Sequence, residues 1–166
     1  MANMRLTILL IGLLPFSLSA EDPLKITKEY LKKNTIKEII FVSTEKQRLY
    51  HIKNNNIIDK FIISSSVYGI GNKSGSNQTP IGLHRIKRKY GEDTPENGLL
   101  VGRIFYGNIA KIHQDNTKSK TDDITSRILW LEGLEEGKNK GNDIDSFKRY
   151  IYIHGTSEEG RLGQPA

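Results

Sequence analysis

The sequence predicts a mainly β domain of sandwich or barrel type, and two observations support this. From residue 38 onward, short runs of β-branched and aromatic residues alternate with clusters of Gly, Asn, Ser and Pro. Helical periodicity is scarce outside one stretch near the amino end. With 166 residues, the chain is long enough for a single domain with one modest core.

Residues 1–20 have the layout of a secretory signal peptide. Arg5 precedes an apolar run from Leu6 to Phe16, and small residues follow up to Ala20, where we expect cleavage. The alternative is a membrane anchor, but the apolar run is much shorter than the ~20 residues that a spanning helix needs. We therefore expect an exported chain that begins at Glu21 and is not stably inserted in a membrane.

The charge and cysteine content limit the classes of function. The formal net charge is +6, which favours an anionic neighbour such as the cell wall or a membrane surface. A nucleic-acid partner is not expected, because the lysines are scattered and the chain carries an export signal. A basic surface without a specific partner remains an equal alternative. The absence of cysteine excludes disulfides, thiolate metal sites and a thiol nucleophile within these 166 residues.

The amino-terminal part begins with a lead segment, residues 21–37. Within it, Leu24 to Asn34 is expected to be a short helix or an extended stretch. A meander of three strands should follow, at Glu38–Ser43, at Arg48–Lys53, and from Ile57 to Ser66 after an Asn-rich turn.

The sequence after Ser66 predicts four further strands separated by loops. Strands are expected at Leu83–Tyr90, Leu99–Tyr106, Arg127–Gly133 and Tyr150–His154. The Gly-rich stretch Gly69–Pro80 should be a surface loop, because it lacks the Lys-Ser/Thr ending and the helix of a phosphate-binding loop. The polar stretch Gly107–Ser126 is long enough to be a functional or mobile loop.

Four histidines are candidates for chemistry, and none has the spacing of a metal site. His51 and His84 alternate with apolar strand residues and should be half-exposed, and His113 falls in a mobile polar loop. His154 ends a predicted strand, and the small residues Gly155 and Thr156 leave one face of its ring open. A lone histidine at a strand end is by default structural, so its position alone assigns no role.

Three segments give further information. The segments Thr79–Arg103, Asp122–Gly141 and Arg149–Ala166 contain a Thr-Pro-x-Gly turn, an Ile-Leu-Trp-Leu strand and Ile-His-Gly-Thr. In this order and spacing they resemble the L,D-transpeptidase catalytic domain of bacterial cell-wall enzymes. The resemblance covers nearly all of Ile39 to Ala166. It implies a β-sandwich with long loops and little helix over residues 38–166.

The resemblance also implies a site. In the family, a histidine at the place of His154 precedes a Ser-His-Gly-Cys run whose cysteine is the nucleophile. That run is not present in the sequence, so the resemblance implies an incomplete catalytic domain that lacks its C-terminal part. His154 matches the general base, and Gly155 and Thr156 match the groups that fix its tautomer. Neither a cofactor nor a metal is implied. Arg103 could contact an anionic substrate, although a strand-surface arginine is the favoured interpretation.

The expected function is that of an exported L,D-transpeptidase in the periplasm or cell wall. A cysteine thiolate attacks a diaminopimelate carbonyl in a peptidoglycan tetrapeptide stem, expels D-alanine and forms a thioester that an amine then opens. Without cysteine, the 166-residue chain should be inactive. The alternatives are a non-catalytic peptidoglycan-binding pseudoenzyme and a nonfunctional gene fragment. The acceptor amine (a stem peptide or a lipoprotein lysine), the balance of transfer and hydrolysis, and the oligomeric state stay open.

Overall fold

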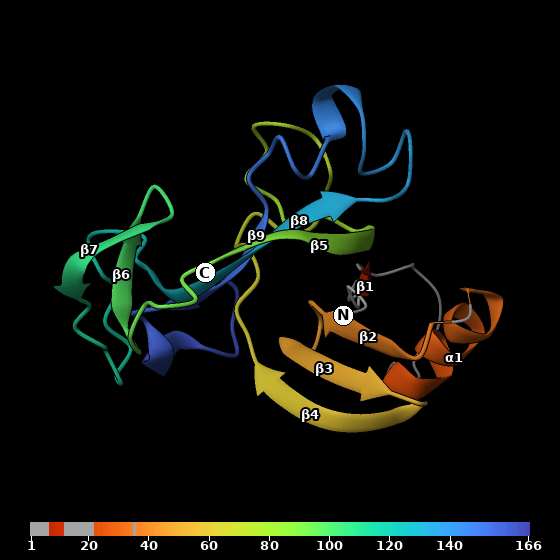
Figure 1. Cartoon of the computed structure of the whole chain (residues 1–166), viewed down its shortest axis with the longest axis horizontal. Helices are drawn as coiled ribbons and strands as arrows, with labels where there is room; N and C mark the ends of the chain where they lie inside the picture. The colour runs from red at the N-terminus through yellow and green to blue at the C-terminus, as the bar shows by residue number, and fades with distance from the viewer. Residues whose placement is uncertain (1–6, 12–21, 35) are drawn as a thin grey trace.

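The computed structural model describes residues 7–11, 22–34 and 36–166, and the fold is mainly β, as predicted (Figure 1). The strands are β1 (Thr7–Ile11), β2 (Glu38–Ser43), β3 (Arg48–Lys53), β4 (Asn56–Ile62), β5 (Gly82–Tyr90), β6 (Gly98–Val101), β7 (Ile104–Ile109), β8 (Ile124–Gly133) and β9 (Tyr152–Thr156). One α-helix, α1 (Pro23–Asn34), and two 3₁₀ turns at Asn142–Ile144 and Glu159–Arg161 complete the described elements.

The strands follow the order β4-β3-β2-β1-β5-β8-β6-β7, and β9 pairs with β8. Strand β1 runs parallel to β2, whereas the other pairings are antiparallel. Figure 1 shows β2, β3 and β4 curving beneath β5, β8 and β9. The two groups of strands therefore face each other like the layers of a sandwich.

The space between these layers holds one apolar cluster. Ile40 and Val42 of β2 and Leu49 of β3 are buried together with Leu131 of β8. Partly buried isoleucines pack around this cluster, at positions 63, 86, 151 and 153. Residues of β2 and β8 thus contribute to the same core, which joins the two layers independently of the strand pairing.

Helix α1 covers the opposite face of β2 and β3. Because side chains alternate along a strand, Ile39 and Phe41 point away from the sandwich interior and toward the helix. The Asp22 carboxylate accepts a hydrogen bond from the Leu24 N–H at 3.0 Å, and Pro23 occupies the first helical position. The lead segment is therefore helical from Pro23 onward, in agreement with the first of the two predicted forms. None of the helices in the described part of the chain is both long enough and apolar enough to cross a membrane.

Strand β1 lies inside the segment predicted to be a signal peptide. Its residues pair with β2 from Thr7↔Ile39 to Ile11↔Ser43, and with β5 from Thr7↔Arg85 to Leu10↔Gly82. The rest of the predicted signal peptide, residues 1–6 and 12–20, lies outside the described residues. Cleavage of the leader stays a prediction, and a chain cleaved after Ala20 would lack the strand between β2 and β5.

The prediction of one strand from Leu99 to Tyr106 is wrong. The segment is a hairpin in which Val101 of β6 pairs with Ile104 of β7. Gly102 and Arg103 form the turn, with φ angles of 55° and 73°. Positive φ at both central residues matches the right-handed twist of a tight two-residue hairpin. The turn therefore places Arg103 at a hairpin tip, which corrects its expected position on a strand surface.

The prediction that His84 is half-exposed is also wrong, because His84 is fully buried, with 0% exposure. Its Nδ1 lies 3.0 Å from the Gly82 carbonyl oxygen, and its Nε2 lies 2.9 Å from Ser146 Oγ. Burial lowers the pKa of His84 from its usual value to about 4, and the hydrogen bond to Gly82 opposes this only in part. His84 is thus a neutral core histidine at neutral pH.

This buried histidine predicts an acid-sensitive fold. The unfolded chain takes up a proton near pH 6.5, whereas folded His84 resists protonation down to about pH 4. Its contribution to stability is therefore complete above pH 6.5 and is lost as the pH falls toward 4. We expect the free energy of unfolding in urea to drop by about 2 kcal/mol between pH 7.5 and pH 5. His84→Gln should flatten this dependence, while His113→Gln should leave it unchanged. An equally steep dependence in His84→Gln would contradict the assignment.

Candidate functional site

His154 lies in the middle of β9, where its side chain is exposed. The predicted strand Tyr150–His154 is shifted by two residues in the structure, to Tyr152–Thr156. Tyr150 adopts a φ of 57°, which is incompatible with an extended strand, so pairing begins only at Tyr152. Residues before and after His154 on β9 therefore pair with β8, so the histidine does not lie at an unpaired strand end.

A β-bulge on β8 lies opposite His154. Thr125 pairs with Gly155 and Ile128 pairs with His154, which leaves Ser126 and Arg127 as additional residues on β8. Ser126 has a φ of 59°, and its hydroxyl accepts a hydrogen bond from the Asn97 N–H at 2.9 Å. Bulges increase the local twist and redirect side chains, and they are frequent beside functional sites. The bulge on β8 therefore lies opposite the junction between His154 and Gly155, two of the predicted site residues.

The hydrogen bond of the His154 ring indicates its tautomer. Nδ1 lies 2.8 Å from the Gly155 carbonyl oxygen. Because a carbonyl oxygen can only accept, Nδ1 of the neutral ring carries the hydrogen and donates it. Nε2 is then left with its lone pair and can accept a proton from a nucleophile. This arrangement fits a general base.

Gly155 fits tightly against β8. A Cβ at Gly155 would lie 2.6 Å from Thr125 Oγ1 and 2.8 Å from the Thr125 carbonyl oxygen. Only glycine therefore allows β9 to approach β8 this closely beside His154. The Thr156 hydroxyl accepts a hydrogen bond from the Glu158 N–H at 3.1 Å. This bond connects Thr156 to the turn that follows β9 and not to the His154 ring.

We expect Gly155→Ala to lower the free energy of unfolding by about 1–3 kcal/mol, the usual cost of overpacking. The added methyl group must push β9 away from Thr125, which also moves the carbonyl that accepts from His154. Thermal unfolding followed by circular dichroism would measure the loss. An unchanged melting temperature would show that the close approach does not constrain this strand.

The segment after His154 is tied to the long polar loop, residues 110–123. Ser157 has 0% exposure, and its hydroxyl donates to Asp123 Oδ2 at 3.0 Å. The His113 N–H donates to the Ser157 carbonyl at 2.8 Å, and the His113 carbonyl accepts from the Gly160 N–H at 2.8 Å. The backbone of His113 therefore supports the segment that follows His154.

Glu158 adds a second link to this loop. Its carboxylate accepts hydrogen bonds from the Ser119 N–H at 2.7 Å and from the Ser119 hydroxyl at 2.9 Å, and it forms an ion pair with Arg161 at 3.0 Å. Burial alone would raise the pKa of Glu158, but these partners outweigh it and lower the pKa below its usual value. Glu158 is therefore ionised at neutral pH and stabilises the loop.

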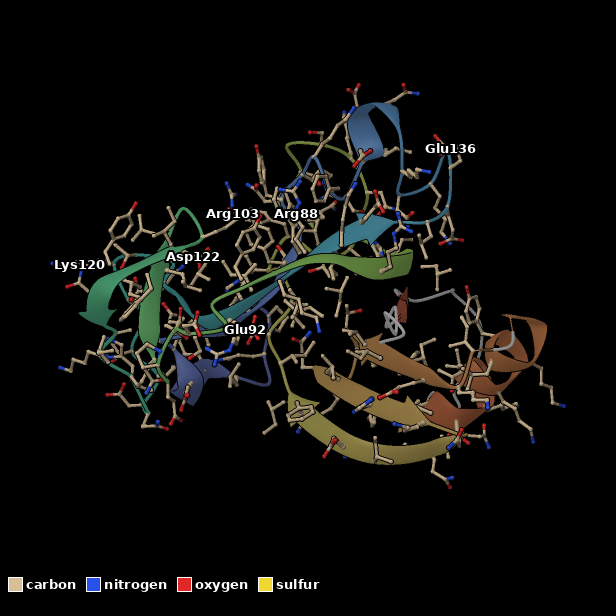
Figure 2. All side chains as sticks on the ribbon, in the orientation of Figure 1. Arg88, Glu92, Arg103, Lys120, Asp122 and Glu136 are labelled. Carbon is tan, nitrogen blue, oxygen red and sulfur yellow. The ribbon has the colours of Figure 1, made fainter. Side chains whose placement is uncertain are left out.

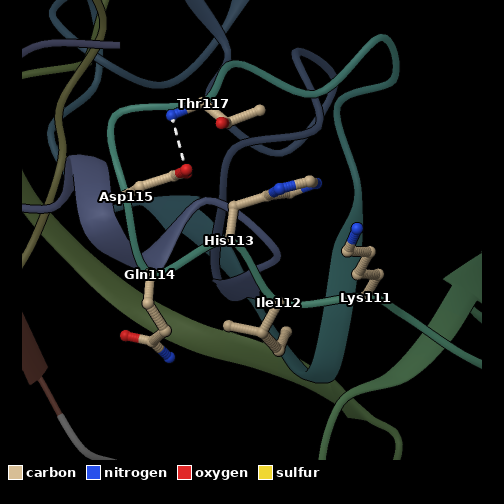
Figure 3. Close-up of a pocket in the computed structure, with 6 residues that line it drawn as sticks. All are labelled: Lys111, Ile112, His113, Gln114, Asp115 and Thr117. Atoms are coloured by element: carbon tan, nitrogen blue, oxygen red, sulfur yellow. Dashed lines mark hydrogen bonds between the residues drawn. The ribbon is translucent and has the colours of Figure 1, made fainter.

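The same loop lines an open pocket of about 510 Å³ (Figure 3). Its walls are formed by Lys111, Ile112, His113, Gln114, Asp115 and Thr117. The Asp115 carboxylate accepts a hydrogen bond from the Thr117 N–H at 3.0 Å, drawn as the dashed line in Figure 3. His154 is not among the lining residues, so the pocket and the histidine are separate features.

The other histidines have structural surroundings. His51 Nε2 lies 2.7 Å from Glu38 Oε1, and its Nδ1 lies 3.4 Å from Asp59 Oδ2. His84 is buried in the core, as described above. Within the described residues, no group of three or more histidine and carboxylate side chains is arranged to hold a metal ion.

Comparison with known proteins gives one result for this chain. Residues 37–166 match the family model described as the L,D-transpeptidase catalytic domain. The matched range begins just before β2 and includes β9 with His154. Searches among curated proteins and among solved structures gave no significant match.

Proposed function

Because the chain belongs to the L,D-transpeptidase catalytic domain family, we propose that it carries the histidine part of an acyl-transfer site for peptidoglycan stem peptides. The family acts on these stem peptides. We propose further that the protein is exported and works in the periplasm or cell wall, which agrees with the predicted signal peptide.

The proposed reaction uses a thiolate and His154. Nε2 of His154 accepts the proton of a cysteine thiol, and the sulfur attacks the diaminopimelate carbonyl carbon of a stem peptide. When the C–N bond to D-alanine breaks, the imidazolium returns its proton to the leaving amine, and a thioester remains. An acceptor amine then attacks the thioester and forms a new amide while the thiol is restored.

One observation carries this proposal: the 2.8 Å contact between His154 Nδ1 and the Gly155 carbonyl. It leaves Nε2 as the acceptor on an exposed ring. In serine and cysteine enzymes a third group fixes the tautomer of the base in this way. We assign that role to the Gly155 carbonyl, with Thr156 supporting the turn that follows.

The 166 residues contain no cysteine, so the thiol has to come from outside them. We therefore expect the 166-residue chain by itself to form no acyl-enzyme. Serine and threonine hydroxyls are far weaker nucleophiles at neutral pH unless they are strongly activated.

The absence of cysteine also favours a second candidate, a non-catalytic module that binds stem peptides. Such a module would use the same face of the sheet but would have no thioester chemistry. The two candidates differ in whether a thiol next to His154 becomes reactive.

Mass spectrometry after incubation with a carbapenem, which acylates the cysteine of this family, tests the proposal. The 166-residue chain should show no adduct. A longer chain, in which Ser-His-Gly-Cys and the closing strands of the family continue from Ala166, should show a stoichiometric adduct. A stoichiometric adduct on the 166-residue chain, or a folded longer chain without one, would contradict the proposed chemistry.

A further inference from the structure

An aromatic and cationic cluster lies on the same face of the sheet as His154. Tyr152 and His154 are two residues apart on β9, so their side chains project to the same side, with Cα atoms about 7 Å apart. Tyr152 pairs with Trp130 of β8, which in turn pairs with Arg88 of β5. Three adjacent strands thus contribute to one surface beside the histidine.

Trp130 is the centre of this cluster. Its ring stacks on Phe147 with centroids 4.1 Å apart and on Tyr150 at 5.4 Å, and it meets Tyr152 edge-on at 5.6 Å. Trp130 is only 6% exposed, whereas Tyr150 is 59% exposed. A large tyrosine ring is therefore presented to solvent on a packed aromatic base, an arrangement typical of binding surfaces.

Two arginines lie on this aromatic base, and Figure 2 labels both of them above β5 and β8. Cζ of Arg103 lies 5.0 Å from the Trp130 ring centroid, and Cζ of Arg88 lies 5.8 Å from it. Arg103 also donates a hydrogen bond from Nη1 to Tyr152 Oη at 3.0 Å. The guanidinium of Arg103 is thus held in place by a ring beneath it and a hydroxyl beside it.

Two of these residues adopt unfavourable backbone conformations. Arg103 has a φ of 73° and Tyr150 a φ of 57°, in a region that is unfavourable for residues with a Cβ. Both side chains pack against Trp130. Strained residues that persist in a fold commonly mark functional positions, and here they meet at one ring.

The two arginines of this surface have no acidic partner. In the part of the chain that the structure describes, neither Arg88 nor Arg103 forms an ion pair. The Tyr152 hydroxyl is the one described acceptor of Arg103, so its remaining N–H groups are free to bind an anion. A planar guanidinium with free N–H groups suits a carboxylate, which it can bind through two parallel hydrogen bonds.

We propose that Arg103, positioned by Trp130 and Tyr152, binds a carboxylate of the peptide on which His154 acts. This inference rests on the proposed function and assigns the substrate contact that orients the peptide along β9. Tyr150 provides the adjoining apolar surface. Arg103 is accordingly a specificity-determining residue, and its role requires the guanidinium fork rather than a positive charge alone.

Trp130 is the sole tryptophan of the chain, so its fluorescence reports directly on this surface. We would titrate the 166-residue chain with a stem tetrapeptide ending in diaminopimelate and D-alanine, and confirm the affinity by calorimetry. Arg103→Asn removes the guanidinium and keeps a residue that tolerates positive φ, so the hairpin should persist. Arg103→Lys keeps the charge without the fork. Lys89→Gln removes one positive charge from the opposite face of β5 and is the matched control.

We expect both Arg103 variants to bind the tetrapeptide at least tenfold more weakly than the wild type, and Lys89→Gln to bind it equally well. A tetrapeptide amidated at its C-terminus shows whether the bound carboxylate is the terminal one or an internal one. Unchanged affinity in Arg103→Asn, or no binding by the wild type, would overturn the inference. Neither result bears on the carbapenem experiment, which tests the chemistry of His154 separately.

Discussion

Replacement of His154 by alanine is expected to reduce acylation by a carbapenem about 10²–10⁴-fold in the longer chain that carries Ser-His-Gly-Cys, the usual contribution of a general base. An ordinary cysteine is mostly protonated at neutral pH, and without Nε2 of His154 no described group is assigned to take the proton. Time-resolved mass spectrometry would give the acylation rate.

The control for this variant is His113→Ala, because His113 contributes its backbone to the segment after His154. It should acylate at the wild-type rate. Circular dichroism should show the same fold in both variants. If His154→Ala is acylated as fast as the wild type, His154 is a structural residue and another group activates the thiol.

Removal of residues 1–20 is expected to lower the free energy of unfolding by about 3 kcal/mol or more. Strand β1 pairs with β2 on one side and with β5 on the other, and each net backbone hydrogen bond contributes about 0.5–1.5 kcal/mol. The apolar cluster of Ile40 and Leu131 should still hold the two layers together. The shortened chain should therefore fold, with less stability and two unpaired strand edges.

Urea denaturation and size-exclusion chromatography would test this expectation. Exposed edges invite pairing with other chains, so the shortened chain should also associate. A chain that lacks only residues 1–6 keeps β1 and serves as the control. Equal stability and a monomeric state in both chains would show that β1 does not contribute to the fold. If residues 1–20 are removed on export, β1 is removed with them. The exported chain should then have the lower stability expected for the shortened chain.

Local sequence signals predicted β2 and β3 well, whereas β4 ends at Ile62 and not at Ser66, and β1 was not predicted as a strand. The bounds of β2 and β3 agree with the prediction, because short runs of β-branched and aromatic residues and a short polar turn define them without reference to the rest of the chain. The hairpin of β6 and β7 was missed because its turn is Gly102-Arg103. An arginine at positive φ gives no turn signal of the Asn-Gly kind.

The surroundings of the candidate site depend on tertiary structure. His154, Gly155 and Thr156 were identified from the resemblance. The bulge at Ser126, by contrast, depends on contacts with the turn near Asn97, which strand patterns do not reveal. The burial of His84 likewise depends on Ser146, far away in the chain.

The cluster around Trp130 was also missed. Its parts come from β5, the β6–β7 turn, β8 and the segment before β9, and only the fold brings them together. The sequence offered two partial signals, a single tryptophan in a predicted strand and Arg103 as a candidate contact for an anionic substrate.

The central claim is that the Gly155 carbonyl fixes His154 with its hydrogen on Nδ1. Long-range ¹⁵N–¹H NMR correlation of the histidine rings, with His154 identified by its loss in His154→Ala, measures this tautomer in the 166-residue chain at a pH where the ring is neutral. We predict a protonated Nδ1 and an unprotonated Nε2 for His154. A neutral His154 with its hydrogen on Nε2 would contradict the account, because the nitrogen that must accept the proton would already carry one.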